Sequence, residues 1–140
     1  YGALYGKYTK MDDVLTYLTN EIIENSSVYN YEKKSFTKVY QEKNLNNVDS
    51  YDIFLEGPTP ILIIDNPIQK NNKSLIMFRD SFGSSLAPLL IENYSKITLI
   101  DLRYVSSKML SEIKEVDLRD DSDVLFLYSV PIINNSFALK

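Results

Sequence analysis

The chain has 140 residues, 44% hydrophobic and 24% charged, which suits one domain with a buried core and excludes a chain disordered throughout. Its formal net charge of -4, without a long basic run, argues against nucleic acid or an anionic membrane as partners. The chain contains no Cys and no His, so disulfides, thiolate chemistry, histidine metal sites and a Ser-His pair built from this chain alone are excluded.

The ends of the chain suggest a segment of a larger protein. Its longest apolar runs are shorter than the ~20 residues that cross a bilayer, so we expect neither a signal peptide nor direct membrane insertion. The sequence begins Tyr1-Gly2-Ala3 without Met. We therefore expect residues 1–140 to form a single domain that is a C-terminal fragment of a longer protein.

The first half of the chain, before about Lys73, is polar and rich in Tyr and Asn. Thr9 fits a capping-box start, and apolar residues follow it at helical spacing, which predicts a helix that ends near residues 25–27. The apolar stripe consists of Met11, Val14, Leu15, Leu18 and Ile22.

Residues 26–73 are expected to form an irregular, Tyr-rich insertion with short strands. Residues 36–40 predict either a short strand or a docked loop, and residues 44–49 a loop. The apolar runs 51–55 and 61–64 end at Gly-Pro and Asn-Pro turns, which predicts two strands that pair as a hairpin.

The second half alternates strand and helix signals. The predicted strands are 75–78, 97–100 and 124–128, and the predicted helices are 86–94 and 106–113. Pro88 is expected in the first turn of its helix, where a missing N–H costs little. This order of elements implies right-handed crossovers and a parallel sheet.

Polar residues follow the first of these strands, at the sheet edge where ligands of open parallel sheets bind. Ser81 comes between a strand and a helix, where free backbone amides can bind the oxyanion of an acyl transfer. Gly83 would let a substrate approach the backbone closely. The alternative is that Ser81 or Ser84 only caps the helix, with Asp80 favouring the helix dipole.

The second strand is followed by Asp101 and Arg103, which are two residues apart and so point the same way in an extended segment. They either face the cleft together, with Arg103 offering donors to a carboxylate or acyl oxygen, or form a surface pair. Ser129 and the stretch 134–136 follow the third strand.

Several other patterns have ordinary explanations. The acidic stretch 117–123 lacks the ligand order of a calcium loop and predicts a solvated loop, so neither a metal ion nor a cofactor is expected. The tyrosines of the first half either stack on carbohydrate or pack a polar subdomain. The Asn134-Asn135-Ser136 glycosylation pattern is either an acceptor site or a chance match.

From Leu75 onward the chain resembles the DHHW family, relatives of the alginate-acetylating SGNH-like proteins. The resemblance is carried by 75–83, 97–104 and 127–136, which look like the family's serine block, its Asp-x-Arg strand and its closing strand and loop. Residues 1–6 also look like the stretch that follows the family's Asp-His-His-Trp motif.

The resemblance implies an α/β fold, a flavodoxin-like or SGNH-like three-layer sandwich with a mainly parallel sheet. It implies a Ser-His-Asp O-acyltransferase or esterase acting on envelope polysaccharide, in a secreted or membrane-anchored parent of the cell envelope or extracellular space. By that match Ser81 is the nucleophile, its amide and that of Gly83 lie near the oxyanion, and Asp101 and Arg103 support the site. The family's Asp and His lie upstream of the serine, so this chain is expected to be inactive alone.

Two functions stay open at this point. One is a fragment of an acyltransferase or esterase, and the other is a non-catalytic module of the same fold that binds envelope glycan or protein. A receiver or flavin-binding domain fits less well, because the acidic pair and lysine of a receiver and a phosphate-binding loop are not placed at these strand ends.

Overall fold

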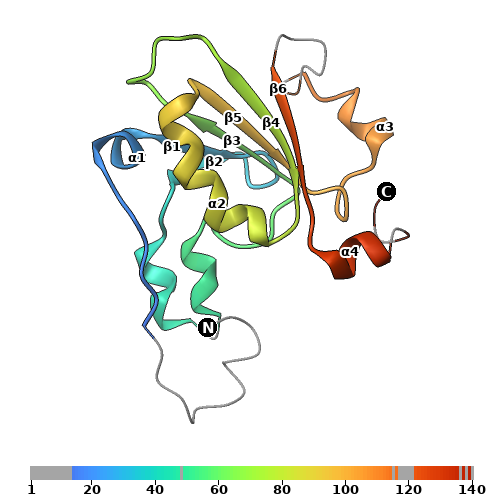
Figure 1. Ribbon diagram of the computed structural model, residues 1–140, viewed down its shortest axis with the longest axis horizontal. Helices are drawn as coiled ribbons and strands as arrows, with labels where there is room; N and C mark the ends of the chain where they lie inside the picture. Colours follow the sequence, from blue (N-terminus) through green and yellow to red (C-terminus); the bar gives the residue numbers. More distant parts are fainter. Residues whose placement is uncertain are drawn as a thin grey trace.

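A computed structural model describes residues 14–47, 49–114, 116, 122–135, 137 and 139. These residues form an α/β fold around a mixed six-stranded sheet with the strand order β2-β1-β3-β5-β4-β6 (Figure 1). The strands are β1 (Ser27–Asn30), β2 (Ser35–Lys38), β3 (Ile61–Asp65), β4 (Ser74–Arg79), β5 (Lys96–Ile100) and β6 (Asp123–Leu127). The predicted helix start at Thr9, the opening residues 1–6, residues 117–121 and Ser136 lie outside the described residues.

Helices and 3-10 helices connect these strands. The helices are α1 (Glu21–Asn25), α2 (Phe82–Leu90), α3 (Ser107–Leu110) and α4 (Val130–Asn134). The 3-10 helices are η2 (Glu42–Asn46), η3 (Ser50–Ile53) and η4 (Ile91–Asn93). None of the described helices has the length and apolar character needed to cross a bilayer.

The second half of the chain forms the predicted parallel unit. β4 pairs in parallel with β5 on one side and with β6 on the other. The period of two along β4 separates two cores, because Leu75 and Met77 pack with Ala87 of α2, whereas Ile76 and Phe78 face the other side of the sheet. The predicted strands at 75–78, 97–100 and 124–128 are therefore confirmed.

The prediction of a mainly parallel sheet is wrong. The first half supplies β1, β2 and β3, and the β1–β2, β1–β3 and β3–β5 pairs are all antiparallel. Antiparallel pairs thus outnumber parallel ones among the described strands. Residues 31–34 alone join β1 to β2, which favours an antiparallel pair there, because a parallel pair needs a long crossover.

The long N-terminal helix is also wrong over residues 14–20, which form no helix. The Asn20 side chain accepts a hydrogen bond from the Ile23 amide (2.9 Å) and so begins a five-residue helix at Glu21. Of the predicted apolar stripe, Val14 and Leu18 are exposed, so the pattern does not bury a helix face here.

The predicted strand at 51–55 is wrong, because Asp49 accepts a hydrogen bond from the Tyr51 amide (3.0 Å) and starts η3. Leu55 and Glu56 then adopt positive φ, which an extended strand does not allow. The predicted hairpin is wrong too, since β3 pairs with β1 and β5. Residues 36–40 contain β2, and Tyr40 bridges to Phe54.

The two crossover helices differ from prediction in their bounds. α2 begins at Phe82, four residues early, so Pro88 lies near its carboxyl end and not in its first turn. The predicted helix at 106–113 is helical only over α3, with the Ser106 hydroxyl accepting from the Met109 amide (3.3 Å).

Candidate functional site

The carboxyl end of β4 is the point at which the sheet connections change direction. The chain leaves β4 for β5 on one side and then passes from β5 to β6 on the other side of β4. In open α/β sheets such a reversal leaves a crevice outside the carboxyl ends of the strands, where ligands bind. Asp80 and Ser81 follow β4 at this place, and Ser129 follows β6.

Asp80 is buried and joins three elements at this reversal. Its amide donates to the Leu127 carbonyl (3.2 Å), its Oδ2 accepts from the Ser129 amide (2.7 Å), and its Oδ1 accepts from the Phe82 amide (3.0 Å). Burial acts to raise the pKa of Asp80, but the hydrogen bonds from Ser129 and Phe82, with the charge of Arg103, lower it overall. The carboxylate is therefore charged and committed to backbone amides.

Ser81 is exposed, and its side chain makes no capping hydrogen bond to α2. The carboxylate of Asp80 occupies that role, so the capping interpretation of Ser81 is wrong. The Ser81 amide also donates to no described residue. Ser84 is buried and accepts from Arg79 Nη1 (3.0 Å), so it is not a cap either.

Gly83 is packed beneath the serine turn and is not exposed to a ligand. Its amide donates to the Asp80 carbonyl (3.1 Å), and a Cβ added at Gly83 would lie 2.5 Å from the Arg79 Cβ. The packing of the Arg79 stem therefore requires glycine here. A role for the Gly83 amide at an oxyanion stays a prediction, and it requires this hydrogen bond to open.

Arg79 is the largest polar side chain buried at this site, and the sequence analysis included it in the serine turn without giving it a role. Its Nη1 donates to Ser84, its Nη2 lies near the Thr59 carbonyl (3.5 Å), and no described carboxylate forms an ion pair with it. Burial lowers the pKa of Arg79, and the charge of Asp101 opposes that effect. Its position at the end of an apolar strand is the sequence feature that could have predicted its burial.

Asp101 and Arg103 lie together, but in a turn and not in the extended segment on which the prediction rested, since the Tyr104 amide donates to the Asp101 carbonyl (3.0 Å). Arg103 Nη2 donates to Asp101 Oδ2 (2.6 Å) and Nε to Oδ1 (2.9 Å), and the Arg103 amide also donates to Oδ1 (3.0 Å). Asp101 is fully buried, whereas the Arg103 side chain is 23% exposed. The hydrogen bonds to Asp101 raise the pKa of Arg103. The pair is thus partly buried, and its supporting role stays a prediction.

Tyr51 reaches the serine turn from the first half of the chain. Its hydroxyl lies 3.0 Å from the Ser81 carbonyl oxygen and 2.9 Å from Ser85 Oγ, and its ring packs on Phe54 with centroids 5.1 Å apart. Sequence analysis missed this residue because it assigned Tyr51 to a strand. Within the described part of the chain, no group of three or more Asp or Glu side chains is arranged to hold a metal ion.

Three solved structures resemble this fold. A DHHW family protein from Eubacterium siraeum superposes with a TM-score of 0.53 and 21% identity over 74% of this chain. PatB1 from Bacillus cereus, in a structure with a sulfonyl adduct, gives a TM-score of 0.60 and 19% identity over 89% of this chain. A second PatB1 structure gives 0.54 and 18% over 83%. The resemblance to DHHW proteins is thus confirmed at the level of fold.

The matched region is a minor part of those proteins. The chain spans 34% of the DHHW protein and 42% and 37% of the two PatB1 chains. In sequence, neither a protein-family model nor a curated protein matches it. The comparisons therefore support a shared fold, and any shared activity is a matter for proposal.

Proposed function

We propose that this chain is the serine-bearing part of an SGNH-like O-acyltransferase or esterase domain with a flavodoxin-like, three-layer arrangement. The observation that carries the proposal is the free hydroxyl of Ser81. It lies exposed after a buried central strand, at the start of α2, while Asp80 performs the capping that the hydroxyl would otherwise provide. A hydroxyl placed this way is available to attack an acyl group.

The chemistry is the transfer of an acyl group through serine. Ser81 Oγ bonds to the ester carbonyl carbon, its proton passes to a general base, and the alcohol leaves with that proton as the acyl-serine forms. A sugar hydroxyl or water then attacks the acyl-serine and regenerates Ser81. The unpaired Ser81 amide can donate to the oxyanion, and the buried charge of Arg79 lies beneath the same turn.

The general base must come from outside these 140 residues, because the chain has no His. Asp80 does not fill this role, since amides hold its carboxylate in the charged form. The chain alone is therefore inactive in this proposal. The sequence resemblance to alginate-acetylating proteins supports an envelope glycan as acceptor, and it supports a whole protein that works in the envelope or outside the cell.

Imidazole can stand in for the absent base, and this provides a direct test. The chain is incubated with 4-nitrophenyl acetate with and without imidazole, and acetylation is located by mass spectrometry of peptides. We expect acetylation of Ser81 that depends on imidazole and that is absent in Ser81→Ala. The control is Ser111→Ala, which replaces an exposed serine at the end of α3 and should leave acetylation of Ser81 unchanged. Equal labelling of all exposed serines would reject a special reactivity of Ser81.

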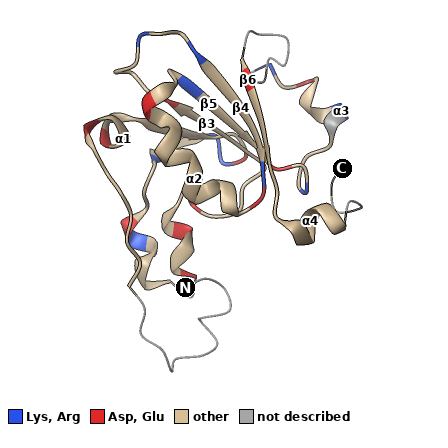
Figure 2. Cartoon of the chain, viewed as in Figure 1, with Lys and Arg blue, Asp and Glu red and all other residues tan. Residues whose placement is uncertain are grey.

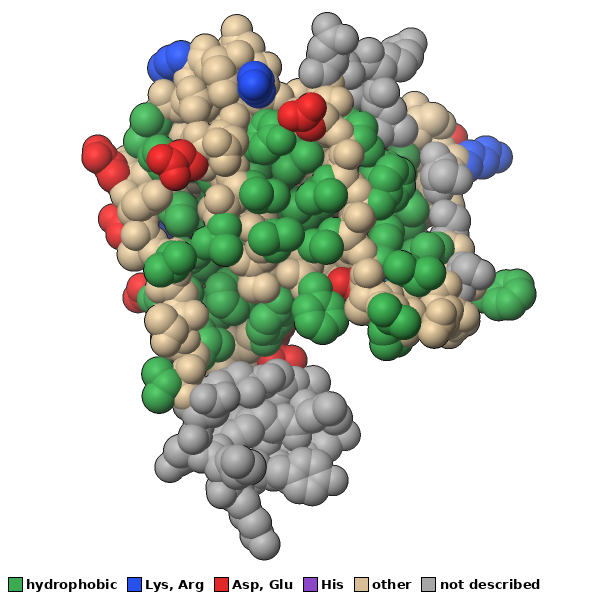
Figure 3. Space-filling model, in the orientation of Figure 1, with side chains coloured by type: hydrophobic (Ala, Val, Ile, Leu, Met, Phe, Trp, Pro, Cys, Tyr) green, Lys and Arg blue, Asp and Glu red, His purple; other side chains and the backbone are tan. Residues whose placement is uncertain are grey.

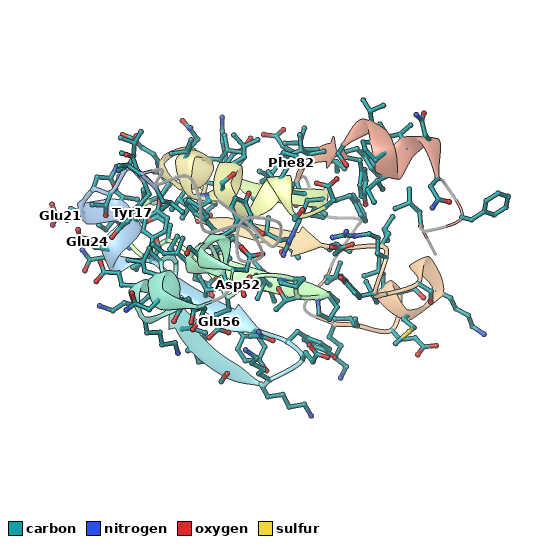
Figure 4. The ribbon with its side chains drawn as sticks, turned by 90° about the horizontal axis from the view of Figure 1, so that it is seen from below. Tyr17, Glu21, Glu24, Asp52, Glu56 and Phe82 are labelled. Atoms are coloured by element: carbon teal, nitrogen blue, oxygen red, sulfur yellow. The ribbon has the colours of Figure 1, made fainter. Side chains whose placement is uncertain are left out.

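A second candidate, a glycan-binding module without catalysis, is favoured by a cleft that Ser81 does not line. The cleft has a volume of about 400 Å3 and is lined by Tyr17, Thr19, Ile23, Glu24 and residues 38–43. The rings of Tyr17 and Tyr40 pack with centroids 4.7 Å apart. Figure 4 shows Tyr17 and Glu24 towards one end of the molecule and Phe82, beside the serine turn, near the middle of its length.

The two candidates separate in a binding experiment with chitotetraose as the probe. A binding module predicts that Tyr17→Ala weakens binding at least tenfold and that Ser81→Ala leaves it unchanged. The acyl-transfer proposal instead predicts that Ser81→Ala abolishes activity of the whole protein. An absence of acyl transfer in the whole protein, with binding lost in Tyr17→Ala and kept in Ser81→Ala, would replace the first candidate by the second.

A further inference from the structure

Strand β6 has the sequence of a central strand but lies at the edge of the described sheet. Val124 to Leu127 is an unbroken apolar run, which is typical of a strand covered on both faces. Yet Val124 is 55% exposed and Phe126 64% exposed. In β4 and β5, which lie inside the sheet, every residue after the first is buried. Apolar side chains of β6 are thus exposed to solvent, whereas those of β4 and β5 are buried.

The backbone of β6 is open as well. Leu127 accepts from the Asp80 amide, so its backbone groups point towards β4. Because these groups alternate in direction along a strand, those of Phe126 and Val124 point to the other side, where the described sheet has no strand. Such a row of unpaired N–H and C=O groups is a template for another strand.

The opposite edge of the same sheet is built differently. β2 has the sequence Ser35-Phe-Thr-Lys38, with Lys33 and Lys34 immediately before it. Lysines and polar residues are what natural proteins place on strands that stay at an edge. The run from Val124 to Leu127 has no such residue, so the two edges differ in their protection.

Exposed apolar residues also lie on helices near this edge, with α2 on the face of the sheet opposite to Val124 and Phe126. Phe82 of α2 is 65% exposed, and Val130 and Ile133 of α4 are 68% and 59% exposed. Figure 3 shows hydrophobic side chains over α2 and α4 in this view, and Figure 2 shows these two helices without charged residues. Residues 124–135 include no charged residue. An apolar surface of this kind marks an interaction site.

We propose that β6, with the adjoining side chains of α2 and α4, is a docking surface for a further β-strand and its covering layer, supplied by a part of the whole protein outside these 140 residues. The solved structures that share the fold support this occupant, because this chain spans only 34–42% of their length. A second copy of the chain is the competing occupant.

The added strand also bears on the serine. Whichever way it runs along β6, one of its ends lies beside Ser129, whose amide is bonded to Asp80 next to Ser81. This end is where a base for Ser81 would enter, a step that rests on the proposed function. The docking surface itself does not depend on that chemistry.

Hydrogen exchange of backbone amides tests the surface. The 140-residue chain is compared with the longest natural polypeptide that contains it. We expect the Val124 and Phe126 amides to exchange roughly 100-fold or more slowly in the longer polypeptide, and the outer amides of β2 to exchange equally in both. Equal exchange of Val124 and Phe126 in the two, or protection in the short chain with a dimer in sedimentation, overturns the proposal.

A pair of matched substitutions supplies a second measurement. Phe126 and Phe36 are both exposed phenylalanines on edge strands, and each packs on an inner ring, Phe78 at 4.7 Å and Tyr29 at 5.0 Å between centroids. In the longer polypeptide, Phe126→Lys should abolish the protection of β6 and Phe36→Lys should leave it intact. Equal effects of the two substitutions contradict the proposal.

The same experiment separates this inference from the proposed function. Ser81→Ala should leave the protection of β6 unchanged, because the hydroxyl is not part of the surface. Protection without acyl transfer would remove the proposed function and keep the docking surface. Acyl transfer without protection of β6 would keep the proposed function and remove the docking surface.

Discussion

The ends of β4 and β5 carry similar motifs, an acid followed closely by a polar residue, yet the structure uses them in opposite ways. After β5, Asp101 binds Arg103 through two side-chain nitrogens, so both members are committed to each other. After β4, Asp80 binds the amides of Phe82 and Ser129, and Ser81 keeps its hydroxyl. An acid next to a possible nucleophile can therefore cap the helix in its place, which leaves the nucleophile's hydroxyl free of that hydrogen bond.

The residues after β5 thus contribute to the stability of the fold, whereas Ser81 after β4 is available for chemistry. The end of β5 supplies an ion pair in which the charge of Asp101 raises the pKa of Arg79 against the effect of burial, whereas the charge of Arg103 lowers it. The end of β4 supplies one group that the fold does not need. Substitutions at the two ends should consequently have effects of very different size on the free energy of unfolding.

The largest effect is expected for Asp101→Asn. It leaves the partly buried Arg103 without a charged partner and removes the negative charge that compensates Arg79, so the chain should lose about 2–3 kcal/mol of unfolding free energy in urea titration. Asp65→Asn, at the exposed end of β3, is the matched control and should change little. Similar losses in both variants would contradict a special role for the Asp101 pair.

Asp80→Asn should lower the unfolding free energy by about 1–2 kcal/mol at neutral pH, because an amide cannot accept from both Ser129 and Phe82 as the carboxylate does. The pKa of Asp80 is lowered by folding, so its contribution is present above the unfolded pKa of about 4 and is lost as the pH falls through the folded pKa. The gap between wild type and variant should therefore close in acid. A gap that persists or widens there means that Asp80 is not the responsible group.

Arg103→Lys should be milder, at about 1 kcal/mol, since a lysine keeps the charge but cannot span both oxygens of Asp101. The comparison is Lys33→Met, which removes the ion pair of the exposed Lys33 with Glu56, whose side chain is 13% exposed, and should cost about 0.5 kcal/mol. If both cost the same in urea titration, the geometry of the Arg103 pair adds nothing to stability.

The smallest effect on stability is expected for Ser81→Ala. Removal of a capping serine lowers the unfolding free energy by about 0.5–2 kcal/mol, but Ser81 makes no capping bond and should stay within about 0.5 kcal/mol of wild type. Thermal unfolding measures this, and the same variant should lose all acetylation at position 81. A large loss of stability would show that the hydroxyl serves the fold after all.

Much of the sheet was predictable from local pattern. The runs at 61–64, 75–78, 97–100 and 124–128 are short, apolar and bounded by polar or turn residues, and each forms a strand. The helix at 14–20 and the strand at 51–55 failed because side-chain caps from Asn20 and Asp49 set other backbone bonds. Such caps compete locally with helices and strands, and the spacing of apolar residues does not reveal them.

The candidate site was predictable in part. The order of strand, serine and helix located Ser81, and the spacing of Asp101 and Arg103 located the pair, because both depend on residues close in sequence. The burial of Arg79, a member of the predicted serine turn, and the contact of Tyr51 with that turn were not predicted. Arg79 is buried by contact with Thr59, twenty residues earlier, and Tyr51 reaches Ser81 across thirty residues.

By itself, the sequence determined the β4–α2–β5–α3–β6 unit, the position of Ser81 at its turning point and the absence of an internal histidine base. The tertiary structure decided that the first half joins the same sheet in antiparallel pairs, that Asp80 and not Ser81 caps α2, and that β6 is left uncovered. Apolar runs and turn residues act over a few positions, so a single stretch of sequence is enough to predict the strands and turns that they form. Strand pairing, capping by a neighbour and burial depend on which distant segments meet, and only the folded chain specifies that.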